Sequence, residues 1–362
     1  MIPSATSPVI LSLLLLISLP LLFILAPRIL PPRILPDDPD DVALLRRAAA
    51  IHSRPSANPH TRLGITNPTP KIAFLFLTNS DLHFAPLWQR FFTARDDHRR
   101  LYNIYVHADP FAPYTDPGGV FKDRLIKSKR TRRASPSLIS AARRLIATAL
   151  VDDSANLFFA LLSQQCVPLH SFRFVYRTLL TPPKPPTEST RESGSELTRL
   201  GSRVGYQSFI EILSNEPKLK ERYTARGSME PEVPFDKFKV GSQFFILVRR
   251  HAVMVVRDTK LWKKFRLPCL RPDACYPEEH YFPTLLSMED PDGCSHFTLT
   301  RVNWTGTAHG HPHAYTPPEV STELIHKLRM SNWTYSYLFA RKFTPECLEP
   351  LMKLAGKVIF RD

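Results

Sequence analysis

The residues that decide the fold are 72–77, Ile-Ala-Phe-Leu-Phe-Leu, a continuous apolar run that ends in the polar sequence Thr-Asn-Ser. Such a run predicts a strand buried on both faces of a sheet. Two later segments have the same character, Tyr-Asn-Ile-Tyr-Val-His at 102–107 and Leu-Phe-Phe-Ala-Leu-Leu at 157–162. With helical patterns between them, these strands indicate an α/β sheet with parallel elements.

The segments around these strands predict the remaining elements. Residues 84–92 have a helical pattern, and Ser135-Pro136 predicts a helix start because proline suits the first helical position. In open α/β sheets, ligands collect beyond the carboxyl ends of the strands. Those ends are residues 78–79, 107–109 and 163–165. We further expect a strand at 240–248 and helices at 251–257 and 319–330.

Composition narrows the class of protein. The 362 residues carry a formal charge of +15 and are 43% hydrophobic, which excludes a wholly disordered chain. The length suits one large domain or two ordinary ones. Glycines number only 12, and neither GxGxxG nor GxxxxGK[ST] occurs, so dinucleotide-binding and P-loop nucleotide sites lack sequence support.

The N-terminal region predicts a membrane anchor. Residues 9–26 are apolar apart from two serines, and a span needs about 20 residues with a lower limit of about 17. A cleaved signal peptide is the alternative. We therefore divide the chain into a short cytoplasmic tail (1–8), a signal-anchor (9–26), a Pro-rich stem (27–70) and a lumenal domain (71–362). Within that domain, residues 181–202 form a polar loop or mobile insert.

The orientation signals disagree. Arg28 and Arg33 follow the apolar run, and the positive-inside rule then weakly favours a cytosolic domain. Two glycosylation sequons, at Asn303 and Asn332, point to the lumen. In an oxidising lumen, five cysteines are enough for two disulfides and one free thiol. Their spacing does not determine which cysteines pair.

Residue type alone makes Pro277-Glu278-Glu279-His280 the best catalytic candidate, because a carboxylate here is suited to act as general base. The structural alternative is that acids after a proline stabilise the first turn of a helix. Adjacent residues diverge in space, so at most one of these glutamates is expected to face a substrate.

The metal signals are weak. The run His309-Gly-His311-Pro-His313 alternates histidines but lacks an HExxH partner motif. The Asp-x-Asp sequences at 38–40 and 290–292 do not follow a buried strand. We therefore expect no metal site, and a metal-dependent hydrolase using the histidines is the less favoured alternative.

Basic residues gather at 127–133, 218–222 and 341–342. A solvated surface explains such runs most simply. A nucleic-acid partner would use the same charge, but the anchor and the sequons argue against it. A diphosphate is the better anionic target, since Arg and Lys neutralise it without a metal.

Several motifs occur together in order: LFLTNSDLHFAPLWQRFF, YNIYVHADP, LLSQQCVPLHSF, GSQFF, CYPEEHYFPTLL, TLTRVNWT, GHPHAY and LFARKF. Over roughly residues 70–360 the chain resembles the core-2/I-branching β-1,6-N-acetylglucosaminyltransferase family. It is most similar to that family's plant branch, the brittle-culm-type glycosyltransferase-like proteins. CYPEEHYFPTLL is the most telling piece of the resemblance.

The resemblance implies a single-pass type II Golgi membrane protein. Its lumenal domain would have a GT-A-like, Rossmann-like mixed sheet flanked by helices. It also implies an inverting, metal-independent transfer of a sugar, expected to be GlcNAc, from a UDP-sugar to a glycan acceptor. In the family motif the base is the glutamate before the histidine, which is Glu279 here. The family pattern places donor contacts at Asp109, Arg222, Arg329, Arg341 and Lys342, and acceptor contacts at Trp304 and Glu278.

Two expectations complete the interpretation. A glycan on Asn303 would crowd Trp304, so we expect Asn332 to be glycosylated and Asn303 to be unoccupied. The main alternative to the enzyme is a non-catalytic glycan-binding or scaffold protein on the same fold, which would keep Trp304 without needing Glu279.

Overall fold

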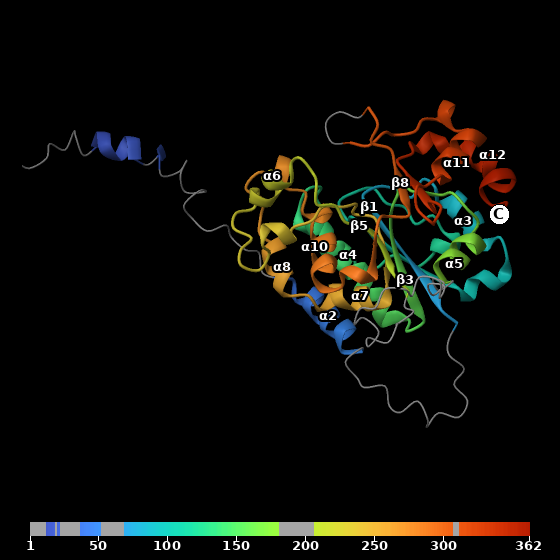
Figure 1. The fold of residues 1–362 in the computed structure, drawn as a ribbon, viewed down its shortest axis with the longest axis horizontal. Helices are drawn as coiled ribbons and strands as arrows, with labels where there is room; N and C mark the ends of the chain where they lie inside the picture. The colour runs from blue at the N-terminus through green and yellow to red at the C-terminus, as the bar shows by residue number, and fades with distance from the viewer. Residues whose placement is uncertain (1–11, 19, 22–36, 52–68, 181–205, 307–310) are drawn as a thin grey trace, which may run out of the picture.

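The computed structural model describes residues 12–18, 20–21, 37–51, 69–180, 206–306 and 311–362 (Figure 1). The expected insert at 181–202 lies outside these residues. So does most of the expected membrane span, of which only 12–18 and 20–21 are described, both as helix. Among the described helices, none combines the length and the apolar character that crossing a membrane requires.

Strand β1 (Lys71–Thr78) is the centre of the domain, as its apolar run predicts. Its side chains alternate between two cores because successive residues of a strand point to opposite faces. Phe74 and Phe76 pack into one core together with Trp88 and Phe172. Leu75 and Leu77 belong to the other core.

A mixed six-stranded sheet surrounds β1 in the order β2-β1-β3-β6-β5-β7. The strands β2 (Tyr102–Ala108) and β3 (Asn156–Ser163) flank β1 and run parallel to it, which confirms the predicted parallel elements. The antiparallel strand β6 (Ile246–Val248) turns the sheet into a mixed one. Beyond it lie β5 (Ser208–Glu211) and β7 (Cys294–His296).

Helices cover both faces of the sheet (Figure 1). The Phe74 face packs against α3 (Ala85–Thr93), α5 (Phe172–Leu180), α11 (Thr322–Arg329) and α12 (Leu348–Leu354). The Leu75 face packs against α4 (Pro136–Asp152), α7 (Arg249–Arg257), α8 (Lys260–Phe265) and α10 (Tyr281–Glu289). Ser135 caps α4 as expected, since its side chain accepts a hydrogen bond from the Ser137 amide.

A small second sheet brings C-terminal motifs together. Its order is β4-β9-β8, formed by β4 (Val167–Pro168), β9 (Phe339–Arg341) and β8 (Thr300–Val302). Strands β8 and β9 run parallel, with Val302 opposite Arg341. This register places the Asn303-Trp304 sequence beside Lys342.

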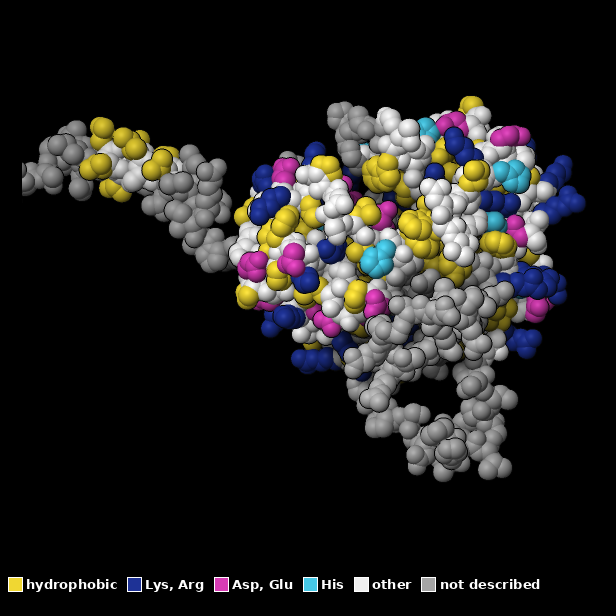
Figure 2. Space-filling model, viewed as in Figure 1, with side chains coloured by type: hydrophobic (Ala, Val, Ile, Leu, Met, Phe, Trp, Pro, Cys, Tyr) yellow, Lys and Arg dark blue, Asp and Glu magenta, His cyan; other side chains and the backbone are white. Residues whose placement is uncertain are grey.

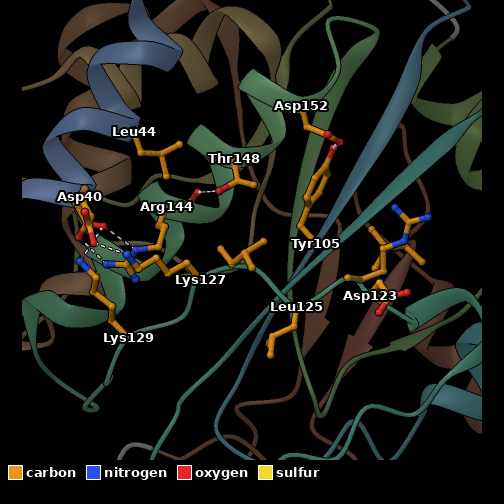
Figure 3. A pocket seen from close by; sticks show the side chains of 14 residues that line it. Asp40, Leu44, Tyr105, Asp123, Leu125, Lys127, Lys129, Arg144, Thr148 and Asp152 are labelled. Carbon is orange, nitrogen blue, oxygen red and sulfur yellow. Dashed lines mark hydrogen bonds and ion pairs between the residues drawn. The ribbon is translucent and has the colours of Figure 1, made fainter.

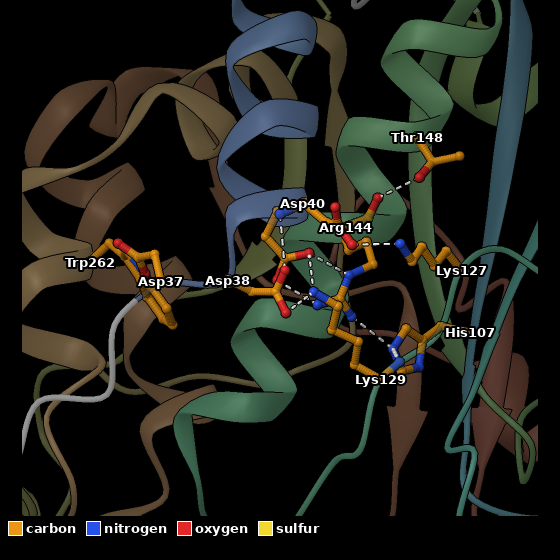
Figure 4. Close-up of polar contacts among 10 residues, drawn as sticks. Asp37, Asp38, Asp40, His107, Lys127, Lys129, Arg144, Thr148 and Trp262 are labelled. Carbon is orange, nitrogen blue, oxygen red and sulfur yellow. Dashed lines mark hydrogen bonds and ion pairs between the residues drawn. The ribbon is translucent and has the colours of Figure 1, made fainter.

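The Pro-rich segment contains the helix α2 (Pro39–Ile51), which packs on the domain. Ala48 is fully buried in the core of the Leu75 face. Arg144 of α4 forms a bidentate ion pair with Asp41 (2.5 and 2.7 Å) and also donates to the Nε2 atom of His107 (3.1 Å) (Figure 4). Acidic residues of the α2 N-terminus thus hold the helix against basic side chains.

Two expectations about local structure need correction. The strand expected at 240–248 is limited to Ile246–Val248, because residues 241–244 leave the sheet and run past the 277–279 turn. One disulfide forms instead of two, between Cys269 and Cys275. Cys166, Cys294 and Cys347 are free and buried at separate places in the fold.

Candidate active site

The Pro277–Glu279 sequence forms a 3-10 turn between Tyr276 and α10. Tyr276 has a left-handed backbone (φ 37°), which turns the chain sharply before the proline. The turn is anchored from beneath: the Gly241 amide donates to the Glu279 carbonyl (2.9 Å), and His280 Nδ1 lies 2.8 Å from the Lys239 carbonyl. The turn therefore has a fixed backbone, as a catalytic carboxylate requires.

The two glutamates of the turn point in different directions, as adjacency predicts. Glu279 is one-third exposed and accepts a hydrogen bond from Nη1 of Arg222 (2.7 Å). Glu278 is only 4% exposed, and its Oε1 atom accepts a hydrogen bond from the Ala134 amide (3.0 Å). Burial, reinforced by the charge of Glu279, raises the pKa of Glu278 to about 7. Glu279 is thus the carboxylate that a substrate can reach, whereas Glu278 faces the protein.

Two arginines approach the ring of Tyr276 beside this turn. The guanidinium carbon of Arg222, in α6 (Leu219–Thr224), is 5.2 Å from the ring centroid, and that of Arg133 is 5.7 Å away. Arg133 also lies 2.7 Å from Nε2 of His311. Tyr276 therefore brings cations from two distant segments to the 277–279 turn.

The end of β9 contributes two more cations. Arg341 lies over the ring of Phe244 (4.3 Å), and burial lowers its pKa, with the charge of Arg133 acting in the same direction. Burial also lowers the pKa of Lys342, and repulsion from the charges of Arg341 and Arg133 lowers it further. The negative charge of Glu279 acts in the opposite direction and raises the pKa of Arg341. These groups are therefore close enough to interact electrostatically.

The loops around β9 bring the expected acceptor region to the same place. The Lys342 carbonyl accepts from the Tyr315 amide (2.8 Å), and the Asn303 carbonyl accepts from the His313 amide (2.9 Å). Trp304 follows Asn303 and is 55% exposed. The structure thus places an accessible indole in the loop beside the cations.

Asp109 organises the basic segment beside the carboxyl ends of β1 and β2. It follows β2, where its amide donates to the Thr78 carbonyl at the end of β1 (3.0 Å). Its carboxylate accepts from the Phe111 amide and from both the amide and the hydroxyl of Thr131. These bonds outweigh burial and lower the pKa of Asp109. Asp109 therefore fixes the basic segment 127–133 to the carboxyl end of the sheet. Its partner Thr131 lies two residues before Arg133.

Arg329 lies apart from this cluster. Its guanidinium donates to the carbonyls of Leu169, Val358 and Ile359 and pairs with Asp362 at 3.4 Å. Leu169 follows β4, and the other three partners belong to the C-terminal segment that packs on α11. The structure therefore gives Arg329 a structural environment and does not place it with the other expected donor contacts.

The histidines and the Asp-x-Asp sequences occupy other environments. His313 pairs with Glu319 (2.7 Å), and His309 lies outside the described residues. Asp290 binds Arg250 and the buried His251. Within the described part of the chain, no three His, Cys, Asp or Glu side chains are grouped as a metal site would need.

Two cavities of the domain lie beside α2. One, of about 510 Å³, is lined by Tyr105, Asp152 and Lys127 between α2 and α4 (Figure 3). Another, of about 910 Å³, lies between α2 and α8 and includes Trp262 and Arg132. Elsewhere on the surface, basic side chains are interspersed with acidic ones on the face that Figure 2 shows.

Sequence reasoning missed three residues of the site. Arg133 was part of a basic run without an individual role. Glu211, at the end of β5, has its pKa raised by burial and by the charge of Glu279. Gly241 approaches the Glu211 backbone so closely that a Cβ atom would lie 1.9 Å from the Glu211 carbonyl oxygen. The glycine of Gly-Ser-Gln-Phe-Phe was the available signal for that close approach.

Comparison with known proteins identifies the family of the chain. The family model of the Core-2/I-Branching enzyme matches residues 72–329, a range that includes Asp109, Arg222, Glu279 and Trp304. Glycosyltransferase BC10 of Oryza sativa subsp. japonica is 26% identical over 324 residues, covering 76% of this chain and 74% of that protein. Both findings confirm the resemblance drawn from the motifs. The chain belongs to the Core-2/I-Branching enzyme family and is a glycosyltransferase of that type.

Proposed function

We propose that this glycosyltransferase moves a sugar from a UDP-sugar to a glycan acceptor without a metal ion, with inversion, and with Glu279 as general base. The observation that carries the proposal is the arrangement around Glu279. It is an accessible carboxylate paired with Arg222, and its charge acts on Arg341 beside Lys342. A base next to an excess of cations suits a reaction in which a hydroxyl is deprotonated while a diphosphate departs.

In the proposed step, the Glu279 carboxylate takes the proton of an acceptor hydroxyl. The oxygen then bonds to the anomeric carbon as the bond from that carbon to the diphosphate oxygen breaks. Attack from the face opposite the leaving group inverts the configuration, and UDP takes the electron pair. Arg341 and Lys342 stabilise the negative charge that grows on the diphosphate.

Arg222 has a positioning role in this proposal. Its 2.7 Å hydrogen bond to Glu279 and its contact with Tyr276 fix the carboxylate in one direction. Trp304 offers an exposed aromatic face on which a sugar ring of the acceptor stacks. Glu278, expected as an acceptor contact, is buried and bonded to Ala134, so we no longer assign it to the acceptor.

Three parts of the proposal, the transferred sugar, the GT-A-like fold and the cellular location, draw on the sequence and the family resemblance. GlcNAc as the transferred sugar follows the family resemblance. A GT-A-like description of the domain is supported by three parallel strands whose carboxyl ends carry Asp109 and Thr78. A Golgi location and an anchor at 9–26 are supported by the apolar run and by the sequons at Asn303 and Asn332.

Binding tests the donor site directly. Titration of a panel of UDP-sugars into the full chain, with EDTA present, is expected to give saturable binding of at least one of them. Lys342→Ala removes one of the proposed diphosphate cations and should weaken that binding about 10-fold or more. Lys353→Ala, an exposed cation of α12 paired with Glu349, is the control and should bind normally. Binding that requires added metal would overturn the proposal.

A further inference from the structure

The backbone at Ala134 links the basic segment to the catalytic turn. Ala134 has a left-handed backbone (φ 55°), an uncommon conformation for a residue with a Cβ atom. Its amide donates to Glu278, and its carbonyl oxygen lies 3.9 Å from the sulfur of Cys269. Ser135 caps α4 directly after it. The hydrogen bond to Glu278 and the start of α4 thus fix the position of Ala134.

Cys269, beside Ala134, belongs to a loop that leads to the turn. The Cys269–Cys275 disulfide closes the loop that leads into Tyr276. Arg226, 1% exposed, donates to the Cys275 carbonyl (3.4 Å) and lies over the ring of Phe265 (4.6 Å). Its charge and that of Glu278 act on each other. Glu278 therefore has a hydrogen bond to Ala134 and an electrostatic interaction with the buried Arg226.

Arg133 precedes Ala134 and extends to the other side, toward the site. Its guanidinium contacts His311 and approaches Tyr276, and its charge lowers the pKa of both Arg341 and Lys342. Three cations from two separate segments therefore repel one another at one place. Such crowding is relieved when an anion with more than one charge binds among them.

We propose that Arg133 is an additional cation of the donor diphosphate site, and that Glu278 is a positioning residue that holds Arg133 there through Ala134. This inference rests on the proposed function, because it assigns the ligand of Arg133 as the diphosphate of the donor. It gives the adjacent glutamates separate tasks: Glu279 meets the acceptor, and Glu278 supports a donor contact. Proton transfer is not part of the role of Glu278.

The test uses UDP and uridine as probes, each titrated into the full chain in the presence of EDTA. Arg133→Ala should weaken UDP binding about 10-fold or more and leave uridine binding unchanged, because only UDP carries the diphosphate. Arg132→Ala is the matched control. Arg132 is adjacent and exposed and carries the same charge, but it lines the cavity beside α2. Equal UDP affinities for the two variants would overturn the inference.

The positioning role has a separate readout. Glu278→Ala should reduce UDP affinity by about the same factor as Arg133→Ala, and Glu278→Gln should restore it because the amide oxygen still accepts from Ala134. The double variant Arg133→Ala/Glu278→Ala should lose no more than Arg133→Ala alone. Additive losses would refute the positioning role even if Arg133 itself binds UDP.

The outcomes separate this inference from the proposed function. If the unmodified chain does not bind UDP without metal, the donor-site proposal fails, and this inference fails with it. If the unmodified chain binds and Lys342→Ala weakens binding while Arg133→Ala does not, only this inference fails. Arg133 is exposed, so its variant tests the proposal even if Glu278→Ala does not fold.

Discussion

Gly241→Ala tests whether the loop beneath the catalytic turn sets the position of Glu279. A Cβ atom at residue 241 would lie 1.9 Å from the carbonyl oxygen of Glu211, which is a backbone atom and cannot move aside like a flexible side chain. Ordinary contacts between carbon and oxygen need roughly 3 Å or more, so one segment must move by about 1 Å. The Gly241 amide is hydrogen-bonded to the Glu279 carbonyl, and the displacement should therefore reach the base.

A shift of about 1 Å at a reacting group costs about 100-fold in rate, and overpacking costs about 1–3 kcal/mol of unfolding free energy. We expect Gly241→Ala to lower kcat about 100-fold, measured as UDP release from the preferred UDP-sugar. Chemical denaturation measures the accompanying loss of stability. Gly356→Ala is the control, since its Cβ atom would meet only the flexible end of Arg90 at 3.1 Å. A folded Gly241→Ala protein with kcat within about threefold of the parent would refute this reasoning.

Three further outcomes are expected. Glu278 has a folded-state pKa of about 7, above its usual 4.5, so the folded protein binds this proton more tightly than the unfolded chain does. The unfolding free energy should thus fall between about pH 4.5 and 7, by up to about 3 kcal/mol, and Glu278→Gln should remove that part of the slope in denaturation curves at several pH values. Trp304→Ala should raise the acceptor KM while UDP affinity is unchanged, and a matching loss of UDP affinity would contradict an acceptor role. Asp41→Asn leaves the 5%-exposed Arg144 without its carboxylate and should cost about 3 kcal/mol, whereas Glu349→Gln in an exposed ion pair should leave the unfolding free energy nearly unchanged.

The central strands could be predicted from sequence because their signal is local. A continuous apolar run such as 72–77 has few ways to avoid burial, and proline after serine marked the start of α4. Strand β9 (Phe339–Arg341) was not predicted, since three residues give no periodicity and its partners come from distant segments. The packing of α2 depends on ion pairs with residues such as Arg144, which the sequence near α2 does not reveal.

The site was predictable to the extent that family motifs carry it. The separation of Glu278 from Glu279 followed from their adjacency, but which one is buried depends on Ala134, more than a hundred residues away in sequence. Arg133 could not be distinguished within Lys-Ser-Lys-Arg-Thr-Arg-Arg, because its direction is set by that same tertiary contact. Arg329 illustrates the opposite case, in which a suitable residue type has all its partners in the C-terminal packing.

The most direct test of the account is turnover of UDP-sugars by the full chain with EDTA present, compared with Glu279→Gln. We predict metal-free UDP release from one donor sugar. Glu279→Gln should reduce this rate by about 100-fold or more while UDP binding stays unchanged, because the amide cannot accept the proton. Release that stops when metal is chelated, or that survives in Glu279→Gln, would contradict the mechanism. Binding without turnover of any UDP-sugar would instead favour the non-catalytic glycan-binding alternative.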